Sequence, residues 1–486
     1  MEKAKSYRAI LRASAIMGIA SILHILFGML RIKIAAVLLG PAGVGLIGLL
    51  QNLMNTGSIM AGLGMDTIGT RNIAAATAEG SLTEVDRTRS LLFWGLAAMG
   101  IVGGVLFAVL RQPLSELILG DRRWENEVGC VAFGLALSVA ATGQVALLNG
   151  LRQIPFLALL KVATSILATC LGTVALLIWG NAGMVLFVIS LPLANFAVGF
   201  VLTSRIPKRH AAPIPTPQLL RGVLNLARLG TPLMIGGIAT LIGQLMVRGI
   251  VQQQLGIEAL GLFEASWMIS MTYIGFVLSA MATDYFPRLS GTIRDHSAAT
   301  QLVNDQTEVA LILVGPILLL LMGLAPTVIS LLYTAEFGQA AEILRWQILG
   351  DLLKVLSWPL AFVLLASGLN RAFLLAEAGA AIVFVGVVWI DLPLLGPIGT
   401  GVGFLALYLF YLPTVFLIAR HSIGFAWTRQ VHTRFVLLAV AAIGIFALSA
   451  EFEVAGAVLG TLLAMCFGLQ GLYQLRKTAR LEHEVP

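Results

Sequence analysis

Long apolar runs alternate with short polar segments along the whole chain. A helix that crosses a bilayer needs roughly 20 mostly apolar residues, and fourteen runs meet that length. They lie at about 12–39, 42–65, 89–110, 127–149, 155–179, 183–203, 229–254, 258–282, 307–333, 340–366, 372–391, 397–419, 434–451 and 454–475. The pattern predicts an all-α polytopic membrane protein with about fourteen spans, twelve being the alternative number.

The first twelve runs form two similar sets of six. At a shift of about 216 residues, glycine-containing landmarks of the first set fall on landmarks of the second. The matches are Leu39–Leu46 with Leu255–Leu262, Gly180–Gly183 with Gly396–Gly399 and, at a shift of about 218, Gly150-Leu151 with Gly368-Leu369. We therefore expect two pseudo-symmetric six-helix bundles around a central cavity, plus two C-terminal helices.

The repeat predicts the domain boundaries. The first bundle is expected at 1–204 and the second at 222–420, with a further helix pair and a cytoplasmic tail at 421–486. Between the bundles, 205–221 holds four prolines beside several basic residues, a composition typical of an extended linker.

Composition narrows the classes of function. Hydrophobic residues make up 58% and charged residues 11%, whereas soluble domains average about a quarter charged. The longest expected outer loop, Arg111 to Asn126, is too short for a catalytic domain, so we predict that the chain is not an enzyme. It lacks the phosphate-binding glycine loop of ATPases. The scattered Cys and His have no metal-ligand spacing, so no metal or cofactor is expected.

The distribution of Lys and Arg predicts orientation. With the N-terminus in the cytoplasm, 22 basic residues fall on the inner side and 7 on the outer side. This bias places both termini of the multi-pass membrane protein in the cytoplasm. Because the basic residues are spread over many short loops, nucleic-acid binding is not expected.

Arg31 and Lys33 interrupt the first apolar run well before Gly40. A lone Arg inside a bilayer costs at least about 2.5–3.5 kcal/mol unless it faces water or an anion. His24 and Gly28 lie on the same helical face as Arg31, whereas Lys33 points to another face. Arg31 is therefore a candidate to line a cavity with His24; the alternative is that both cations extend to outer headgroups.

The second repeat carries a comparable cation. Arg248 lies one residue from the position equivalent to Arg31, and Gln244, Gln252, Gln253 and Gln254 surround it. Two Arg from two related helices could hold one phosphate group, because the guanidinium donates paired hydrogen bonds. We predict substrate binding by Arg31 and Arg248, assisted by Lys33 and His24.

Acidic residues also lie within predicted spans. Glu264 has no basic residue on its own span, although an ion pair with Arg248 is equally plausible, and it is a candidate site for a coupling H⁺ or Na⁺. Asp351 is a second candidate, but its simplest interpretation is an ion pair with Lys354, three residues later.

The segment Gly62-Leu-Gly-Met-Asp66-Thr-Ile-Gly69-Thr-Arg71 follows the second span. It partly resembles the inner loop of major facilitator transporters, in which an Asp and an Arg latch helix ends, although basic residues usual in that loop are absent. Asp66 and Arg71 are therefore candidates for a gate or latch, with a structural turn and a surface ion pair as the alternative.

The chain resembles the Wzx-type polysaccharide flippases, in the MOP superfamily that also contains MATE drug exporters and the lipid II flippase MurJ. The resemblance covers nearly the whole chain. It rests on Arg31-Ile-Lys-Ile-Ala-Ala-Val-Leu-Leu-Gly40-Pro, on Arg71-x-Ile-Ala after span 2, and on the six-helix repeat. It implies two bundles arranged like a V around a cationic cavity, with an Arg nine residues before the glycine that ends helix 1 binding a diphosphate.

Arg31 stands nine residues before Gly40, whereas span 2 has Gln51, Asn52 and Asn55 in place of an Arg of lipid II flippases. This departure favours a sugar-lipid relative over MurJ itself. The resemblance implies alternating-access transport of undecaprenyl-diphosphate-linked oligosaccharide, such as an O-antigen or exopolysaccharide repeat unit. Membrane lipids and other polysaccharide-assembly proteins are the expected partners of a monomer.

Two other transport or membrane functions share part of this pattern. A major facilitator or MATE-type exporter of small molecules would have the repeat, but its cavity should be apolar or acidic, against which Arg31 argues. A membrane-embedded polymerase or ligase would need a larger outer loop.

Overall fold

A computed structural model describes residues 2–207 and 215–484 of the chain. Within those ranges every regular element is a helix. The middle of the predicted linker, residues 208–214, lies outside the described residues. The chain divides into two compact units, Met1–Gln253 and Gln254–Pro486.

The first unit contains one long broken helix followed by helices that pack against it and against one another. Its elements are α1 (Glu2–Gly62), α2 (Met65–Ala78), α3 (Leu82–Val109), the short α4 (Arg111–Leu114), α5 (Glu125–Gly150), α6 (Ile154–Trp179), α7 (Met184–Ser204) and α8 (Thr216–Leu255). Nearly all of α8, which begins the second sequence repeat, belongs to the first unit, which ends at Gln253.

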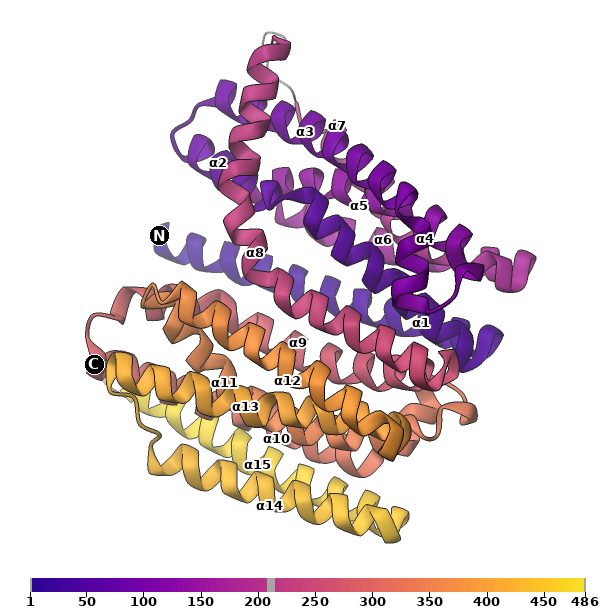
Figure 1. Ribbon diagram of the computed structural model, residues 1–486. Helices are drawn as coiled ribbons and strands as arrows, with labels where there is room; N and C mark the ends of the chain where they lie inside the picture. Colours follow the sequence, from indigo (N-terminus) through magenta and orange to yellow (C-terminus); the bar gives the residue numbers. More distant parts are fainter. Residues whose placement is uncertain (1, 208–214, 485–486) are drawn as a thin grey trace. The chain divides into compact units, whose positions relative to one another are not determined.

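The second unit contains the remaining helices. They are α9 (Ile257–Thr292), α10 (His296–Leu332), α11 (Ala340–Ala366), α12 (Asn370–Leu395), α13 (Gly399–Ile423), α14 (Arg429–Glu451) and α15 (Glu453–Glu484). The last two form a hairpin that packs along α10 (Figure 1).

Every predicted span coincides with a helix, which confirms the all-helical membrane fold. Ten stretches of the described chain are long and apolar enough to cross a membrane. Three of them each hold two helical segments: Ala15–Gly62, Ile154–Ser204 and Asn370–Ile423. Helices α3, α8, α9 and α10 extend several residues beyond the apolar runs, because a helix continues into polar sequence that a hydropathy pattern does not count.

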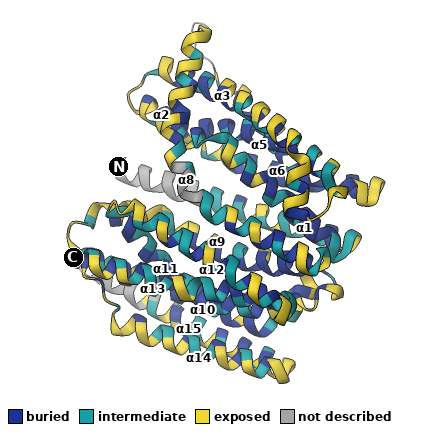
Figure 2. Cartoon of the chain, viewed as in Figure 1, coloured by how far each residue is buried: buried dark blue, intermediate teal, exposed yellow. Residues whose placement is uncertain are grey.

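The outward faces of the helices carry the chemistry of a lipid-facing protein. Large apolar side chains such as Phe133, Trp389 and Leu394 are 59%, 61% and 77% exposed. Exposed and buried residues alternate around most helices in Figure 2. In water such exposure would be unfavourable, whereas in a bilayer lipid tails solvate these faces. The protein is therefore a multi-pass membrane protein.

The backbone preserves the internal repeat in detail. Gly40 and Gly256, about 216 residues apart, both have a positive φ with an extended ψ (64°, −167° and 85°, 179°). Gly180 and Gly396 are also alike, at 54°, −128° and 59°, −146°. These conformations are accessible almost only to glycine, so the matched glycines mark equivalent turns.

One predicted match is corrected. At a constant shift the partner of Gly368 is Arg152, not Gly150. Both Arg152 and Gly368 have a positive φ, 52° and 72°, and both lie just before the start of α6 or α12. The first repeat tolerates a non-glycine residue at this turn, so a comparison of glycines alone selects the nearby Gly150.

The repeats differ where α1 meets α2. In the second repeat α9 is continuous, whereas in the first the chain breaks at Leu63 and Gly64, both with positive φ. The break brings Gly64 against the backbone of Gly230 on α8, so closely that a Cβ on Gly64 would lie 2.5 Å from the Gly230 oxygen. Two glycines are therefore needed for this close approach.

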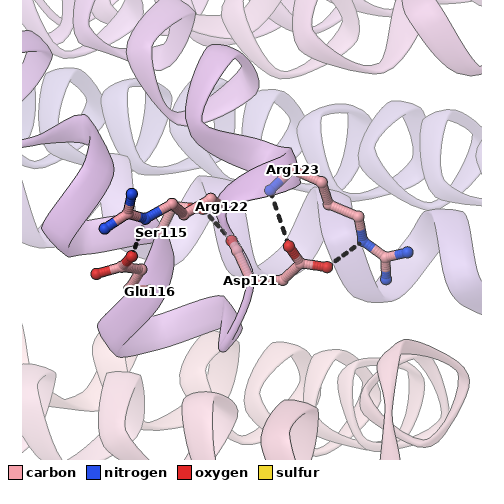
Figure 3. Close-up of polar contacts among 5 residues, drawn as sticks. All are labelled: Ser115, Glu116, Asp121, Arg122 and Arg123. Atoms are coloured by element: carbon pink, nitrogen blue, oxygen red, sulfur yellow. Dashed lines mark hydrogen bonds and ion pairs between the residues drawn. The ribbon is translucent and has the colours of Figure 1, made fainter.

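The segment between α3 and α5, the longest predicted outer loop, is held by its own polar contacts (Figure 3). Ser115 donates to the Asp121 carbonyl at 2.6 Å. The Asp121 carboxylate accepts from the Arg123 backbone and pairs with its guanidinium at 2.9 Å, while Arg122 pairs with Glu116. These ion pairs are exposed and contribute little stability, but they give the loop a defined conformation.

Candidate functional site

Arg31 lies inside the first unit, where α1, α6 and α7 meet. Its side chain is only 6% exposed. Nη2 donates to the backbone carbonyl of Phe187 and, at 3.1 Å, to the Ser190 hydroxyl, and the guanidinium carbon lies 4.2 Å from the Phe187 ring centroid. Nε is buried without a hydrogen-bond partner. Protein groups thus surround the cation, so the structure contradicts the alternative in which Arg31 extends to the lipid headgroups. That Arg31 lines a cavity stays a prediction.

Polar residues continue from Arg31 along the contact between α1 and α6. His24 Nδ1 lies 2.5 Å from the Ser165 hydroxyl, and Lys161 Nζ donates to Ser21 at 3.5 Å. Here we call this row the α1–α6 seam. It comprises Ser21, His24 and Arg31 of α1 and Lys161, Ser165 and Thr169 of α6.

The seam follows from helix periodicity. Lys161, Ser165 and Thr169 are spaced by four residues, so they share one face of α6. Thr169 and Ser165 each donate to the carbonyl four residues earlier, and Thr169 also reaches the Phe27 carbonyl of α1 at 3.4 Å. These hydroxyls therefore give α6 a polar face toward α1, and both of them are hydrogen-bonded.

Lys33 and Arg248 lie elsewhere in the first unit. Lys33 is half-buried on another face of α1, as its spacing from Arg31 predicted. Arg248 is 3% exposed on α8, where Nη1 donates to the Gln244 carbonyl at 3.2 Å. Gln252, one turn later, is buried with Oε1 unpartnered. At the predicted polar end of this helix Gln252 is thus buried, whereas Gln253 and Gln254 are exposed, and a role in substrate binding stays a prediction.

Asp351 and Lys354 interact electrostatically, as expected, but they do not form a direct ion pair. Asp351 is completely buried on α11, and Oδ2 accepts hydrogen bonds from Ser270 at 2.7 Å and Tyr273 at 2.5 Å, both on α9. Oδ1 is buried without a hydrogen-bond partner in the described structure. The direct hydrogen-bond donors to Asp351 are thus hydroxyls of a neighbouring helix rather than the ammonium group of Lys354 on its own helix.

Lys354 and Glu377 are two further charged residues in the interior of the second unit. Lys354 Nζ donates to Met271 Sδ at 3.3 Å and lies 5.9 Å from the ring centroids of Phe404 and Tyr408. Glu377 on α12 accepts from the Tyr411 hydroxyl at 2.6 Å. Two carboxylates and one ammonium group therefore share the interior of α9, α11, α12 and α13 with several tyrosines.

Glu264 lies near the start of α9 and is 7% exposed. It is close enough to Tyr333 for an electrostatic interaction. The rings of Phe263 and Trp267 on the same helix lie 5.4 Å apart, and Trp267 stacks on Phe384 of α12 at 6.0 Å. Glu264 thus lies on α9 beside an aromatic cluster, and its proposed part in ion coupling stays a prediction.

The segment predicted as a loop with a latch is a helix. Asp66 and Arg71 both lie on α2, five residues apart, and therefore about 140° apart around its axis. In the part of the chain that the structure describes, they do not form an ion pair with each other, because that separation points them in different directions. Arg71 is exposed and Asp66 half-buried; a latch function stays a prediction.

The comparisons with known proteins agree on a family. Residues 34–342, more than half of the chain, match the family described as "Polysaccharide biosynthesis protein". The chain belongs to this family. It is also 23% identical over 407 residues to proteins named "Lipid III flippase" of Escherichia coli (strain K12) and Shigella flexneri, which covers 82% of this chain and 95% of each relative.

Solved structures of similar fold include two types of transporter. The structure described as "Lipid II flippase MurJ, inward closed conformation" matches with a TM-score of 0.71 at 12% identity, over 96% of this chain and 99% of that one. An inward-facing MATE multidrug transporter of the MOP superfamily matches with a TM-score of 0.66 at 17% identity, over 82% and 94%. The chain shares the fold of these proteins, and together with the family match this confirms the resemblance predicted from sequence.

Sequence reasoning misses the partners of the predicted cations. The sequence shows that Lys161 is a charge within a predicted span, but it does not identify Ser165, Thr169 or Ser190 as polar partners. The four-residue spacing of Lys161, Ser165 and Thr169 is a usable signal, since it places three polar groups on one face of an otherwise apolar helix. Ser190 is isolated in its helix, and only the packing of α7 against α1 reveals it.

Proposed function

We propose that the protein is a flippase that moves undecaprenyl-diphosphate-linked oligosaccharide, an O-antigen or exopolysaccharide repeat unit, across the bacterial inner membrane by alternating access. The proposal places both termini in the cytoplasm, as the 22-to-7 distribution of basic residues favours. The function is transport rather than catalysis.

The observation that carries the proposal is a row of cations and hydroxyls within membrane-spanning helices of a polysaccharide-biosynthesis family member. Arg31, Lys161 and His24 follow the α1–α6 seam, and relatives named as lipid flippases support the same class of function. A diphosphate is the part of the substrate that needs cations, because moving it through an apolar membrane without them is very costly.

Arg31 and Arg248 would bind the diphosphate, assisted by Lys33 and His24. Attraction between opposite unit charges about 4 Å apart is about 4 kcal/mol at an effective dielectric constant near 20. The unpartnered Nε of Arg31 leaves one donor for such a ligand. The sugars would occupy the polar cavity, and the polyprenyl tail would remain in lipid.

Transport would be coupled to H⁺ or Na⁺ through Asp351 or Glu264. Asp351 supports this idea because a buried carboxylate with one oxygen bound by two hydroxyls and the other unpartnered can gain a proton or cation without rearranging its helix. No other cofactor enters the proposal, and membrane lipids and further polysaccharide-assembly proteins would be the partners of a monomer.

Complementation tests the proposal. In a strain that lacks its repeat-unit flippase, the wild type should restore surface polymer and Arg31→Ala should abolish it at equal membrane abundance. Arg345→Ala is the matched control. Arg345 is also a buried Arg, 7% exposed, but it lies on α11, where its Nε donates to the Met322 carbonyl. Arg31→Lys should retain part of the activity because it keeps the charge.

The outcomes separate the alternatives. Equal loss in Arg31→Ala and Arg345→Ala would indicate damage to folding rather than to a diphosphate site, and full activity of Arg31→Ala would refute its binding role. If the wild type fails in strains with several different repeat units but confers resistance to cationic drugs, the alternative of a major facilitator or MATE-type small-molecule exporter would replace the flippase.

A further inference from the structure

A cavity of about 650 Å³ lies in the first unit between α3, α5 and α7. None of its lining residues belongs to α1 or α6, so it is separate from the α1–α6 seam. Its volume is within the range of small-ligand sites. It lies beside the first turns of α3 and the last turns of α5 and α7, and the ends of spanning helices are where lipid headgroups meet a membrane protein.

The floor of this cavity contains a buried amide without partners. Gln144 of α5 is 6% exposed, and both its Nε2 and Oε1 lack hydrogen-bond partners in the described structure. Its amide packs directly over Gly199 of α7, where any Cβ would collide with it. Because buried polar groups are nearly always hydrogen-bonded, an unpaired donor and acceptor beside a cavity point to a polar ligand.

Two opposite charges lie beside that amide. Asp86 is 8% exposed and lines the cavity from α3. Arg89, one turn later, donates to the carbonyls of Thr203 at 2.5 Å and Ile206 at 3.2 Å, which fixes its guanidinium at the end of α7. Those two bonds use two of the five N–H donors of the guanidinium, so the held cation can still bind an anion.

The rim of the cavity is aromatic and faces outward. Phe93, Trp94 and Phe200 are 42%, 58% and 50% exposed, and the Phe93 and Trp94 rings meet edge to face at 5.3 Å. Tryptophan beside a charged residue is typical of the membrane interface, where its ring contacts both acyl chains and headgroups. The ligand therefore has a polar head and an apolar tail.

We propose that this cavity binds a phospholipid with a phosphoethanolamine headgroup. Arg89 binds the phosphate, and Asp86 accepts a hydrogen bond from the ammonium group. The Gln144 amide forms hydrogen bonds with the headgroup. The acyl chains lie along the aromatic side chains of Phe93, Trp94 and Phe200. Asp86 and Arg89 already interact electrostatically; a zwitterionic headgroup adds one charge of each sign to this pair, whereas an anionic headgroup adds a negative charge next to the Asp86 carboxylate. A choline headgroup has no N–H to donate to the carboxylate or the amide.

Native mass spectrometry of the full-length protein tests this proposal. Detergent-purified protein is titrated with phosphatidylethanolamine, phosphatidylglycerol or phosphatidylcholine of identical acyl chains. The wild type should bind one phosphatidylethanolamine at least about tenfold more tightly than either other lipid. Gln144→Leu should remove most of this preference, and Ala140→Phe, which fills the cavity from α5, should abolish the tight site.

Phe133→Leu is the matched control, because Phe133 is an exposed aromatic residue of the same helix that does not line the cavity; it should bind like the wild type. Size-exclusion profiles confirm that each variant is folded. Equal binding of the three lipids, a preference for phosphatidylglycerol, or an unchanged preference in folded Gln144→Leu and Ala140→Phe would each overturn the proposal. The result is independent of substrate flipping, which is measured separately by complementation.

Discussion

Arg31 and Asp351 show two ways in which a membrane interior holds a charge. Arg31 is covered by a ring face, a carbonyl and a hydroxyl, all of which accept or attract a cation. Asp351 is held by two hydroxyl donors on one oxygen. Each arrangement leaves one polar atom unpartnered, Arg31 Nε and Asp351 Oδ1. Unpaired buried groups are costly, which makes both residues suited to binding a transient ligand or ion.

At this scale we predict that Asp351→Asn uncouples transport from an ion gradient. The Asn oxygen can still accept from Ser270 and Tyr273, so the fold should persist, but the side chain can no longer change charge. In proteoliposomes, flipping of a fluorescent lipid-linked diphosphate should accelerate with an imposed H⁺ or Na⁺ gradient for the wild type but not for Asp351→Asn. Tyr273→Phe keeps the carboxylate and should remain responsive; a gradient response in Asp351→Asn would exclude Asp351 as the coupling site.

At the scale of elements, glycines determine where the long helices break. Gly40 interrupts α1 with a backbone conformation that side chains disfavour, and Gly256 does the same between α8 and α9. Pro41 follows Gly40 at once and cannot donate a helical hydrogen bond. The break therefore follows from two adjacent residues and recurs at the equivalent point of the repeat.

We predict that Gly40→Ala destabilises the protein by about 1–3 kcal/mol, the usual cost of a residue forced into a disfavoured backbone region. Thermal unfolding in detergent would measure the effect as a lower midpoint. Gly18→Ala on the same helix is the control, because Gly18 is helical and no atom lies within 4 Å of the place that an alanine methyl group would take. It should be neutral or stabilising by roughly 0.5–1 kcal/mol. Equal midpoints for the two variants would contradict this account of Gly40.

At the scale of the whole molecule, the repeat and the basic residues predict how the chain threads the membrane. Each repeat contains an even number of spans, so both begin on the same side of the bilayer. Exposed basic residues such as Arg371, at the start of α12, favour the proposed orientation, because the cytoplasmic side favours positive charge.

We predict that the segment around Arg123 faces the periplasm and that the turn at Glu79 faces the cytoplasm. Both residues are exposed. In a background with the three native cysteines replaced, Arg123→Cys should react with a membrane-impermeant maleimide in intact spheroplasts, and Glu79→Cys only after lysis. The opposite pattern would invert the proposed orientation and with it the assignment of both termini.

The sequence by itself determined the helices, their repeat and the cations inside the membrane. The length of an apolar run predicts a spanning helix. Gly40 and Gly256 match at a shift of 216 residues, so this pair of equivalent turns was detectable without a structure. The unfavourable position of Arg31 was equally clear, because its cost depends only on depth in an apolar run.

Only the tertiary structure decided which groups those charges meet. Ser190 reaches Arg31 from α7, and Ser270 and Tyr273 replace Lys354 at Asp351, since these contacts depend on how helices far apart in sequence pack. The same packing places the Gln144 amide over Gly199 beside Asp86 and Arg89. Periodicity tells which face of a helix is polar, but the partner of that face is set by the neighbouring helix, which no local pattern specifies.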